Sequence, residues 1–443
     1  MLKEIKGEPK LSGGIMKRNH SGYYTCLIAI VFILVSAWSS LVLAQSVDTR
    51  TIEKMQRLIE QQQSQLDAQA KAIEDMKKQL QALSRAAQPS AATAEKLPSL
   101  QNIVKPGSDK VDVQLYGQVN RGVMYVDDGN DSDFYHVDND NSSTRLGINA
   151  KTRTGGDLEV GARFEVQYES NSSASVSQTS NSTGPDNFTQ RHLDFFLESK
   201  RFGKLSMGQG NTASNETSEV DLSGTSLIGY SDPETVAGGI FFFDKTTSSL
   251  SATTVASVFN NMDGLSRKDR LRYDTPELLG FVLAGSAVEN NAEDVALWYN
   301  RKFSGIKLAG AVAYANPGSS SVDNQLNGSV SILLDGGFNA TFAAGNQYMR
   351  ASGREDATFY YAKLGFVRKY FDIGPTALSV DYGRHNDVVQ NDDEADTFGF
   401  QFVQNLADWR TELYLGYRNY SLDSKGKDFE DINAVLGGGR IKF

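Results

Sequence analysis

The sequence has 443 residues, 40% of them hydrophobic, and a formal net charge of −10 at pH 7. The mild acidic excess, without a basic stripe, argues against a nucleic-acid partner. Outside the amino terminus, no apolar run approaches the roughly 20 residues of a membrane-spanning helix, which argues against a helical membrane protein. The high content of Gly, Phe and Tyr with only 9 Pro instead favours many short strands with aromatic edges.

The amino terminus has the pattern of a secretory signal peptide. Lys17 and Arg18 precede the apolar run 26–35, and the small residues that lead up to Ala44 form a cleavage site. We predict a signal peptide over residues 1–44 with cleavage after Ala44. An uncleaved anchor helix is the alternative.

Two further features of this segment bear on the mature chain. Met1 and Met16 are both candidate start residues, because residues 1–15 look like extra sequence before an ordinary signal. Cys26, the one cysteine, would be removed with the signal peptide. The mature chain would then cross an oxidising periplasm without thiols.

Within residues 46–85, the mainly apolar positions recur with a period of seven residues. Two series, three residues apart, continue for five heptads without Gly or Pro, which predicts a short coiled coil. Gln62 and Gln69 are polar core positions of the kind that fix register and strand number, so we predict a parallel trimer; a lone solvated helix is the alternative. Residues 86–110, with three prolines and no periodicity, form the predicted linker. The predicted core residues of the coiled coil are Ile52, Met55, Ile59, Gln62, Leu66, Gln69, Ile73, Met76, Leu80 and Leu83.

From residue 111 to the end, strand signals with a period of two recur. In 409–420, Leu413 and Leu415 share one face with aromatic residues, whereas Glu412 and Arg418 share the other. A strand with one apolar and one charged face suits lipid outside and water inside. We therefore predict an all-β transmembrane barrel over residues 111–443, with about 16 antiparallel strands. The predicted strands span 112–126, 144–152, 157–169, 191–199, 204–210, 268–274, 281–288, 292–302, 306–314, 325–334, 338–348, 357–369, 376–385, 397–405, 409–420 and 431–443.

The sequence pattern leaves two points of the barrel open: the number of wall strands and the inward or outward direction of the side chains in one strand. Segments 239–244 and 249–259 lie inside the longest connection and would raise the number to about 18 if they joined the barrel. In 191–199, Arg191 shares parity with Leu193 and Phe195, so the phase of this strand is not fixed by the pattern.

The connections alternate between short turns and long polar loops, as in an up-and-down barrel with all its turns at one rim. An even strand number puts both chain ends at that rim, the periplasmic one, and so places the coiled coil in the periplasm. Because lipid cannot satisfy an open strand edge, the last strand is expected to close the ring against the first.

The longest connection, 211–267, is expected to carry function. Its apolar runs 227–228 and 240–243 would be costly to leave in water, so we expect it to fold inward as a constriction loop that narrows the lumen. Its acidic residues that we expect at the constriction are Glu216, Glu219, Asp221, Asp232 and Glu234.

The residues on the polar face of the predicted strands include several cations. We expect these cations to form a basic wall opposite the loop. Arginines that face carboxylates across a narrow lumen would create a transverse field, which orders polar solutes and selects by charge. The alternative is that these cations only solvate a wet interior and pair with Glu159, Glu165 and Glu412. The residues of the predicted basic wall are Arg145, Arg163, Arg270, Arg272, Lys363, Arg410 and Arg418.

Five short motifs follow one another along the predicted barrel: QLYG at 114–117, STRLG at 143–147, FEVQYE at 164–169, FGKLSMG at 202–208 and LRYDTP at 271–276. Together with the terminal Phe443, their order resembles the general porin family of Gram-negative outer membranes. The resemblance implies a homotrimer of sixteen-stranded barrels and a third loop folded into each pore. It also implies assembly by the outer-membrane insertion machinery, which reads the last strand up to Phe443.

Two details refine the resemblance. Segment 232–239 resembles the acidic tip of the third loop, at a stretched spacing within a loop that is longer than usual. With its periplasmic coiled coil, the chain is similar in particular to the DcaP-like trimeric porins. That similarity implies a preference for organic anions such as dicarboxylates.

These observations favour a channel for passive diffusion of small hydrophilic solutes, embedded among outer-membrane lipid and lipopolysaccharide. The alternative is a structural anchor whose coiled coil tethers the barrel to peptidoglycan or a periplasmic partner. A hydrolase is disfavoured, because no nucleophile motif surrounds any of the four histidines, which are His20, His136, His192 and His385. No cofactor and no metal site are expected, since the acidic loop runs lack calcium-loop spacing.

Overall fold

The computed structural model describes residues 111–153, 156–182, 188–319 and 321–443. The predicted signal peptide, coiled coil and linker lie outside the described residues. None of the helices in this described part combines the length and the apolar character needed to span a bilayer. The longest connection contains one of the short helices, α3 (Val255–Val258).

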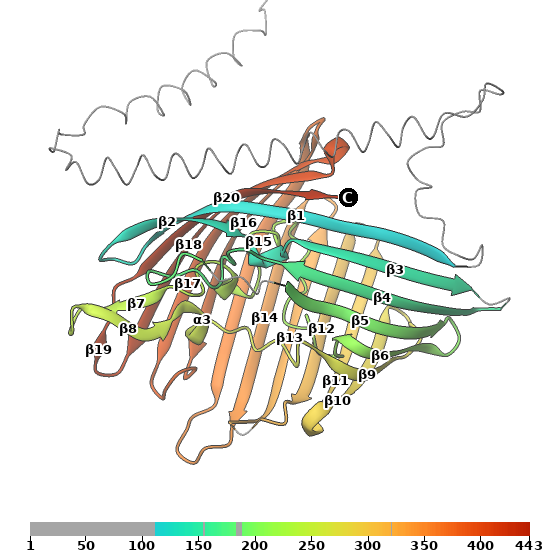
Figure 1. Cartoon of the computed structure of the whole chain (residues 1–443), viewed down its shortest axis with the longest axis horizontal. Helices are drawn as coiled ribbons and strands as arrows, with labels where there is room; N and C mark the ends of the chain where they lie inside the picture. Colours follow the sequence, from blue (N-terminus) through green and yellow to red (C-terminus); the bar gives the residue numbers. More distant parts are fainter. Residues whose placement is uncertain (1–110, 154–155, 183–187, 320) are drawn as a thin grey trace, which may run out of the picture. The chain divides into compact units, whose positions relative to one another are not determined.

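Sixteen antiparallel strands form a closed barrel (Figure 1), which confirms the predicted fold class. Each wall strand pairs with its neighbour along the chain, and β1 pairs with β20. The wall strands are β1 (Asp112–Asp127), β3 (Arg145–Arg153), β4 (Leu158–Tyr168), β5 (Phe188–Ser199), β6 (Gly203–Asn211), β9 (Arg267–Asp274), β10 (Phe281–Val288), β11 (Glu293–Phe303), β12 (Ile306–Asn316), β13 (Val322–Leu334), β14 (Phe338–Met349), β15 (Ala357–Phe371), β16 (Gly374–Asn386), β17 (Glu394–Leu406), β18 (Thr411–Ser424) and β20 (Ile432–Lys442).

Four further strands lie outside the ring of wall strands. Two of them lie in connections between wall strands. The strand β2 (Ser132–Asp138) lies between β1 and β3 and pairs with β1, and β19 (Lys427–Asp428) lies between β18 and β20 and pairs with β18. The two segments that could have made eighteen wall strands do form strands, β7 (Phe241–Asp244) and β8 (Ser249–Thr254). They pair with each other in a separate two-stranded sheet. They are therefore part of the long connection and not of the wall.

The last strand closes the ring, as expected from the cost of an open edge. The register between β1 and β20 runs from Gln118 opposite Lys442 to Asp127 opposite Asn433. Beyond it, the Phe443 amide donates to the Gly117 carbonyl at 3.0 Å, and the Gly117 amide donates to the Phe443 carbonyl at 3.1 Å. The terminal residue is thus held by two backbone hydrogen bonds.

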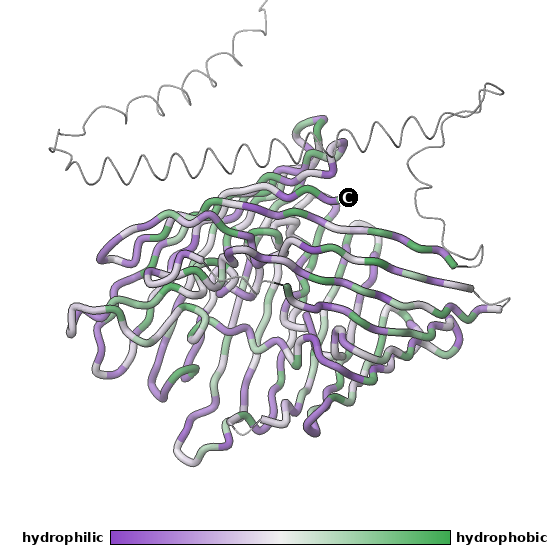
Figure 2. Tube along the Cα trace, viewed as in Figure 1, coloured by the Kyte–Doolittle hydropathy of each residue, from purple (hydrophilic) through white to green (hydrophobic). Residues whose placement is uncertain are grey.

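Hydrophilic and hydrophobic residues alternate along the wall strands (Figure 2), and successive residues of a strand face opposite sides of the wall. In β18, Leu413 and Leu415 are 46% and 48% exposed, whereas Tyr414 and Arg418 are 4% and 2% exposed. Exposed leucines at every second position form the outward band that a transmembrane barrel presents to lipid. The phase predicted for this strand is confirmed.

The strand that the pattern could not phase contains a β-bulge. Glu165 of β4 lies opposite His192 of β5, but Val166 lies opposite Gln190, so Arg191 is the extra residue. The bulge turns Arg191 inward, although it shares parity with the exposed Leu193 and Phe195.

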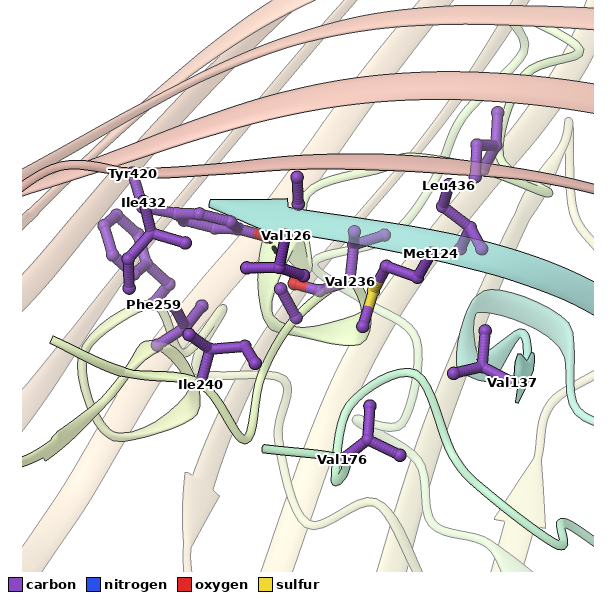
Figure 3. Packing of buried hydrophobic residues seen from close by; sticks show 14 of the residues in the cluster. Met124, Val126, Val137, Val176, Val236, Ile240, Phe259, Tyr420, Ile432 and Leu436 are labelled. Carbon is purple, nitrogen blue, oxygen red and sulfur yellow. Dashed lines mark hydrogen bonds between the residues drawn. The ribbon is translucent and has the colours of Figure 1, made fainter. Parts of the chain in front are cut away.

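A hydrophobic cluster fills the space between the wall and the inserted loops (Figure 3). Val236, Ile240 and Phe259 from the longest connection pack with Met124 of β1 and Tyr420 of β18. All five side chains are at most 4% exposed. The longest connection therefore lies inside the barrel as a packed element, which sets the shape of the lumen.

Candidate functional site

The connection from β6 to β9, residues 212–266, is called the inner loop here, and it follows the inner faces of β10 to β18. Outside the β7–β8 pair, its backbone needs other hydrogen-bond partners, because it leaves bulk water without joining the wall. Inward serines of the wall supply them. The amides of Ala213, Val220 and Leu222 donate to the hydroxyls of Ser286, Ser329 and Ser331 at 2.6, 2.9 and 3.0 Å.

A buried ion pair fixes the middle of the inner loop. The Lys363 ammonium of β15 lies 2.7 Å from the Asp221 carboxylate and donates to the Gly229 carbonyl at 2.7 Å. The two charged side chains are 0% and 3% exposed. Buried charges without water are tolerated only when they are paired and hydrogen-bonded, so Lys363 holds two points of the loop.

A second buried pair lies beneath the same part of the loop. Arg418 of β18 binds Asp381 of β16, with its two terminal nitrogens 2.9 and 3.0 Å from the two carboxylate oxygens. Tyr361 and Gln401 also donate to Asp381, at 3.0 and 2.6 Å. Gly229 packs so closely that a Cβ there would lie 3.1 Å from the Arg418 guanidinium. Neither buried cation is left to face water.

Between the inner loop and the opposite wall lies a cavity of about 690 Å³, called the constriction cavity here. Four arginines and six carboxylic acids line it. The basic residues are Arg145, Arg191, Arg267 and Arg440. The acidic residues are Asp140, Glu216, Glu219, Asp232, Glu234 and Asp263.

The arginines of the constriction cavity differ in how firmly they are paired. Arg191 lies 2.6 Å from Glu165, and Arg440 lies 2.6 Å from Glu412. Arg145 donates to the Ser142 hydroxyl at 2.8 Å, but its nearest carboxylate, Glu165, is 3.9 Å away. The Arg145 guanidinium is therefore the one of these three with the most charge left for a solute.

The carboxylic acids on the loop side are crowded, which disfavours their charged forms. Burial raises the pKa of Glu234 to about 7, and the nearby Asp140 carboxylate reinforces the shift. Burial also raises the pKa of Asp263 to about 7. Burial, with neighbouring carboxylates, raises the pKa of Glu219 and of Asp232 well above the ordinary range. Near neutral pH this face is therefore only partly ionised.

A second cavity of about 730 Å³ lies toward the turn rim, next to the β5–β6 and β9–β10 turns. Cations outnumber acids among its lining residues. Arg270 and Arg272 are paired with Asp194 and Asp274 at 2.8 and 2.6 Å, whereas Arg163 is 3.4 Å from Asp194. The lining cations are Lys151, Arg163, Lys200, Lys204, Arg270 and Arg272, and the lining acids are Asp194, Glu198, Asp274 and Glu277.

The predicted site residues are thus divided among the constriction cavity, the turn-side cavity, the buried contact between inner loop and wall, and the turn rim. Arg145 lines the constriction cavity with four acidic residues of the loop, which are Glu216, Glu219, Asp232 and Glu234. Arg163, Arg270 and Arg272 line the turn-side cavity. Lys363, Arg418 and Asp221 are sealed between loop and wall. Arg410 is exposed at the turn before β18, with φ 49°.

Sequence reasoning did not select Arg191, Arg267, Arg440, Asp140 or Asp263, which also line the constriction cavity. Parity left the direction of Arg191 open, and the bulge that turns it inward gave no signal in the sequence. Arg440 could have been found from its place opposite Glu412, since β18 and β20 are consecutive wall strands. Asp140 and Asp263 lie in connections, where no periodicity predicts the direction of a side chain.

Comparison with known proteins gives one family and several similar barrels. A family model described as Gram-negative porin matches residues 81–425, more than half of the chain. No curated protein matches the sequence.

Solved structures are similar at low sequence identity. One is an anion-selective porin from Comamonas acidovorans, at 16% identity over 75% of this chain and 100% of that chain, with a TM-score of 0.51. Another is OmpT, an outer membrane protein of Vibrio cholerae, at 14% identity over 77% and 100%, with a TM-score of 0.50. The outer membrane channel DcaP of Acinetobacter baumannii matches at 15% identity over 75% and 98%, with a TM-score of 0.49. The first two likenesses describe the fold alone.

Proposed function

Since the chain belongs to the Gram-negative porin family and forms an outer-membrane channel, we propose that it passes small hydrophilic solutes by passive diffusion and favours organic anions such as dicarboxylates. The observation that carries the proposal is the constriction cavity, which four arginines line together with acidic residues of the inner loop. A wet lumen narrowed at one level selects solutes by charge at that level.

The charge balance supports the preference for anions. Arginine keeps its charge at every pH that a bacterium meets, whereas the pKa values of Glu234 and Asp263 are raised to about 7 by burial. The positive face of the constriction cavity is therefore permanent and the negative face is not. The turn-side cavity adds an excess of cations on the same path.

We also propose a homotrimer in which the outer face of β1 is covered by a neighbouring barrel. Arg121 shares the outward parity of Val119 and Val123, and it is paired with Asp138. Its side chain is 44% exposed on a face that otherwise presents apolar residues. A charge in contact with lipid is costly at mid-depth, and a polar surface of a partner barrel would remove that cost.

The ion selectivity of the purified oligomer tests the proposed function. In planar bilayers under a salt gradient, the reversal potential should show a preference for chloride over potassium, and succinate should reduce the chloride current. Replacing Arg145→Gln should lower the permeability ratio by roughly fivefold, the effect of ~1 kcal/mol at a charge in contact with a hydrated ion.

Arg410→Gln provides the matched control, because Arg410 was also predicted for the basic wall but lies exposed at the turn rim. Its reversal potential should equal that of the unaltered channel. A preference for cations in the unaltered channel, or equal effects of the two substitutions, would contradict the proposed function.

A further inference from the structure

We propose that the turn-side cavity is a second solute site, which binds the phosphate group of small phosphorylated solutes more tightly than it binds carboxylates. The donors are Lys151 of β3, Arg163 of β4 and Lys204 of β6, which line this cavity from neighbouring parts of the wall. The inference goes beyond the proposed function, because it concerns a cavity other than the constriction and a different anionic group.

A phenylalanine ring holds two of these cations together. The ammonium groups of Lys151 and Lys204 lie 5.6 and 4.3 Å from the centre of the Phe196 ring. Phe196 of β5 lies opposite Gly161 of β4, where a Cβ would clash with the ring, so the glycine leaves room for it. Because an aromatic face attracts ammonium groups, the ring keeps the two lysines close despite their mutual repulsion.

Neither lysine is firmly neutralised by a carboxylate. Lys204 lies 3.5 Å from Glu198, and the two side chains are 38% and 48% exposed. Lys151 lies 2.9 Å from Glu159, but the lysine side chain is 47% exposed. Ion pairs as exposed as these are weak, so both ammonium groups stay available to an anion that enters the cavity.

Arg163 differs from the other two arginines of the turn-side cavity. Arg270 and Arg272 each donate to a carboxylate and to a backbone carbonyl at 2.6 to 2.8 Å, so their donors are used within the protein. Arg163 is 3.4 Å from Asp194 through both of its contacts, and its side chain is 33% exposed, against 2% for Arg270. Arg163 therefore has donor capacity left for a solute.

Three loosely paired cations in one cavity suit a compact group with two negative charges. A phosphate ester has three strong acceptor oxygens that point in different directions, and it is a dianion above its second pKa of about 6. A carboxylate has a single charge and two oxygens in one plane. Lysine binds phosphate as a point charge, without the planar geometry that a carboxylate shares with arginine.

The turn-side cavity also has the size that a conducting site needs. Its volume of about 730 Å³ leaves room for a small phosphorylated solute together with water. Conduction requires a site that is favourable enough to enter and weak enough to leave. We therefore expect weak retention, which is measured best as interruption of an ion current.

Glycerol phosphate and succinate provide the sharpest test, because both carry two negative charges at about pH 8. The two charges are on one group in glycerol phosphate and on two separate groups in succinate. In planar bilayers with the purified oligomer, glycerol phosphate should halve the chloride current at a concentration about fivefold lower than succinate does. Equal blocking concentrations, or tighter blocking by succinate, would overturn the inference.

Two variants assign the effect to the turn-side cavity. Lys151→Gln combined with Lys204→Gln should raise the blocking concentration of glycerol phosphate about fivefold and change that of succinate by less than about twofold. Lys307→Gln is the matched control, because Lys307 lies at the turn end of β12 and does not line the turn-side cavity. It should retain the full advantage of glycerol phosphate. An advantage that survives the double substitution, or that Lys307→Gln also removes, would overturn the assignment.

A further variant tests Phe196 as a positioning residue. Phe196→Leu keeps every charge of the cavity but removes the aromatic face, so the advantage of glycerol phosphate should fall by about twofold. The reversal potential in potassium chloride should stay the same, because no charge is lost. An unchanged advantage would contradict the role of the ring. If a variant does not assemble, the comparison of the two solutes on the unaltered channel still decides the inference.

The outcomes separate this inference from the proposed function. If glycerol phosphate and succinate interrupt the current equally and the channel prefers chloride, only the turn-side site fails. If the channel prefers cations and neither solute interrupts the current, the proposed function fails as well. Arg145→Gln should weaken blocking by succinate and retain the advantage of glycerol phosphate, since Arg145 lines the constriction cavity and not the turn-side cavity.

Discussion

Two parts of the barrel's inner surface carry inward cations but use them differently. On β15 and β18, Lys363 and Arg418 lie beneath the inner loop, each bound to a carboxylate, and their side chains are 0% and 3% exposed. On β3, Arg145 is 21% exposed and faces the constriction cavity, with its nearest carboxylate 3.9 Å away. We call these the covered wall and the open wall. The comparison teaches that a side chain directed inward reaches water only where the loop leaves the wall bare.

The strongest test of this difference removes one cation from each wall. Lys363→Met leaves Asp221 buried without its partner and should destabilise the barrel by about 3–5 kcal/mol, the usual cost of an uncompensated buried charge. Arg145→Met removes a partly hydrated, loosely paired cation and should cost at most about 1 kcal/mol. Denaturant unfolding of the refolded barrels in lipid vesicles measures both values. Similar losses in the two variants would contradict the distinction between the walls.

Much of the fold was predictable from the sequence, because lipid and water impose opposite demands on alternate residues. The wall strands, including the last one up to Lys442, follow directly from that alternation. The same rule failed at Arg191, where one extra residue in β5 reverses the parity. It also could not distinguish Arg145 from Lys363, since both are inward and cationic.

The alternation of side chains along the strands does not predict the path of the inner loop. Its course depends on contacts between residues far apart in sequence, such as Leu222 with Ser331 and Tyr420 with the Pro233 carbonyl. Serine is common on any wet inner wall, so Ser331 gave no signal that a loop amide would bind it. The acidic residues of the loop were recognised from composition, but their separation into Asp221 beneath the loop and Asp232 at the cavity was not.

A steric change in the covered wall should have the next largest effect. A Cβ on Gly416 of β18 would lie 2.6 Å from Ile228 of the inner loop. Gly416→Val should therefore displace the loop, cost about 1–3 kcal/mol and alter the single-channel conductance.

The matched control is Gly336→Val in the β13–β14 turn, where a Cβ would meet no atom within 4 Å. Its conductance should equal that of the unaltered channel, and its stability should change little. A Gly416→Val channel with unaltered conductance and stability would show that the loop does not pack on β18 as described.

Titration of the loop face should have the smallest effect. Burial raises the pKa of Glu234 and of Asp263 to about 7, so both are largely ionised near pH 8 and largely protonated near pH 6. Asp140 faces Glu234, while Glu216 and Arg267 face Asp263. Lowering the pH removes negative charge from the loop face while the arginines stay charged.

The preference for chloride should therefore rise by roughly twofold between about pH 8 and about pH 6. The reversal potential under a fixed salt gradient measures the change. Glu234→Gln should reduce the pH dependence. A preference for chloride that falls as the pH is lowered would contradict the predicted sign.

Accessibility of the two walls to a charged reagent tests the central claim most directly. Gln167→Cys places a thiol at the constriction cavity, and Ser331→Cys places one beneath the inner loop at a position that is 0% exposed. Each variant would carry a single thiol, since Cys26, the one cysteine in the sequence, lies in the predicted signal peptide. Added to open channels in planar bilayers, a negatively charged thiosulfonate should modify Gln167→Cys and reduce its current, while Ser331→Cys stays unmodified over the same time. Equal modification of the two thiols would contradict the account.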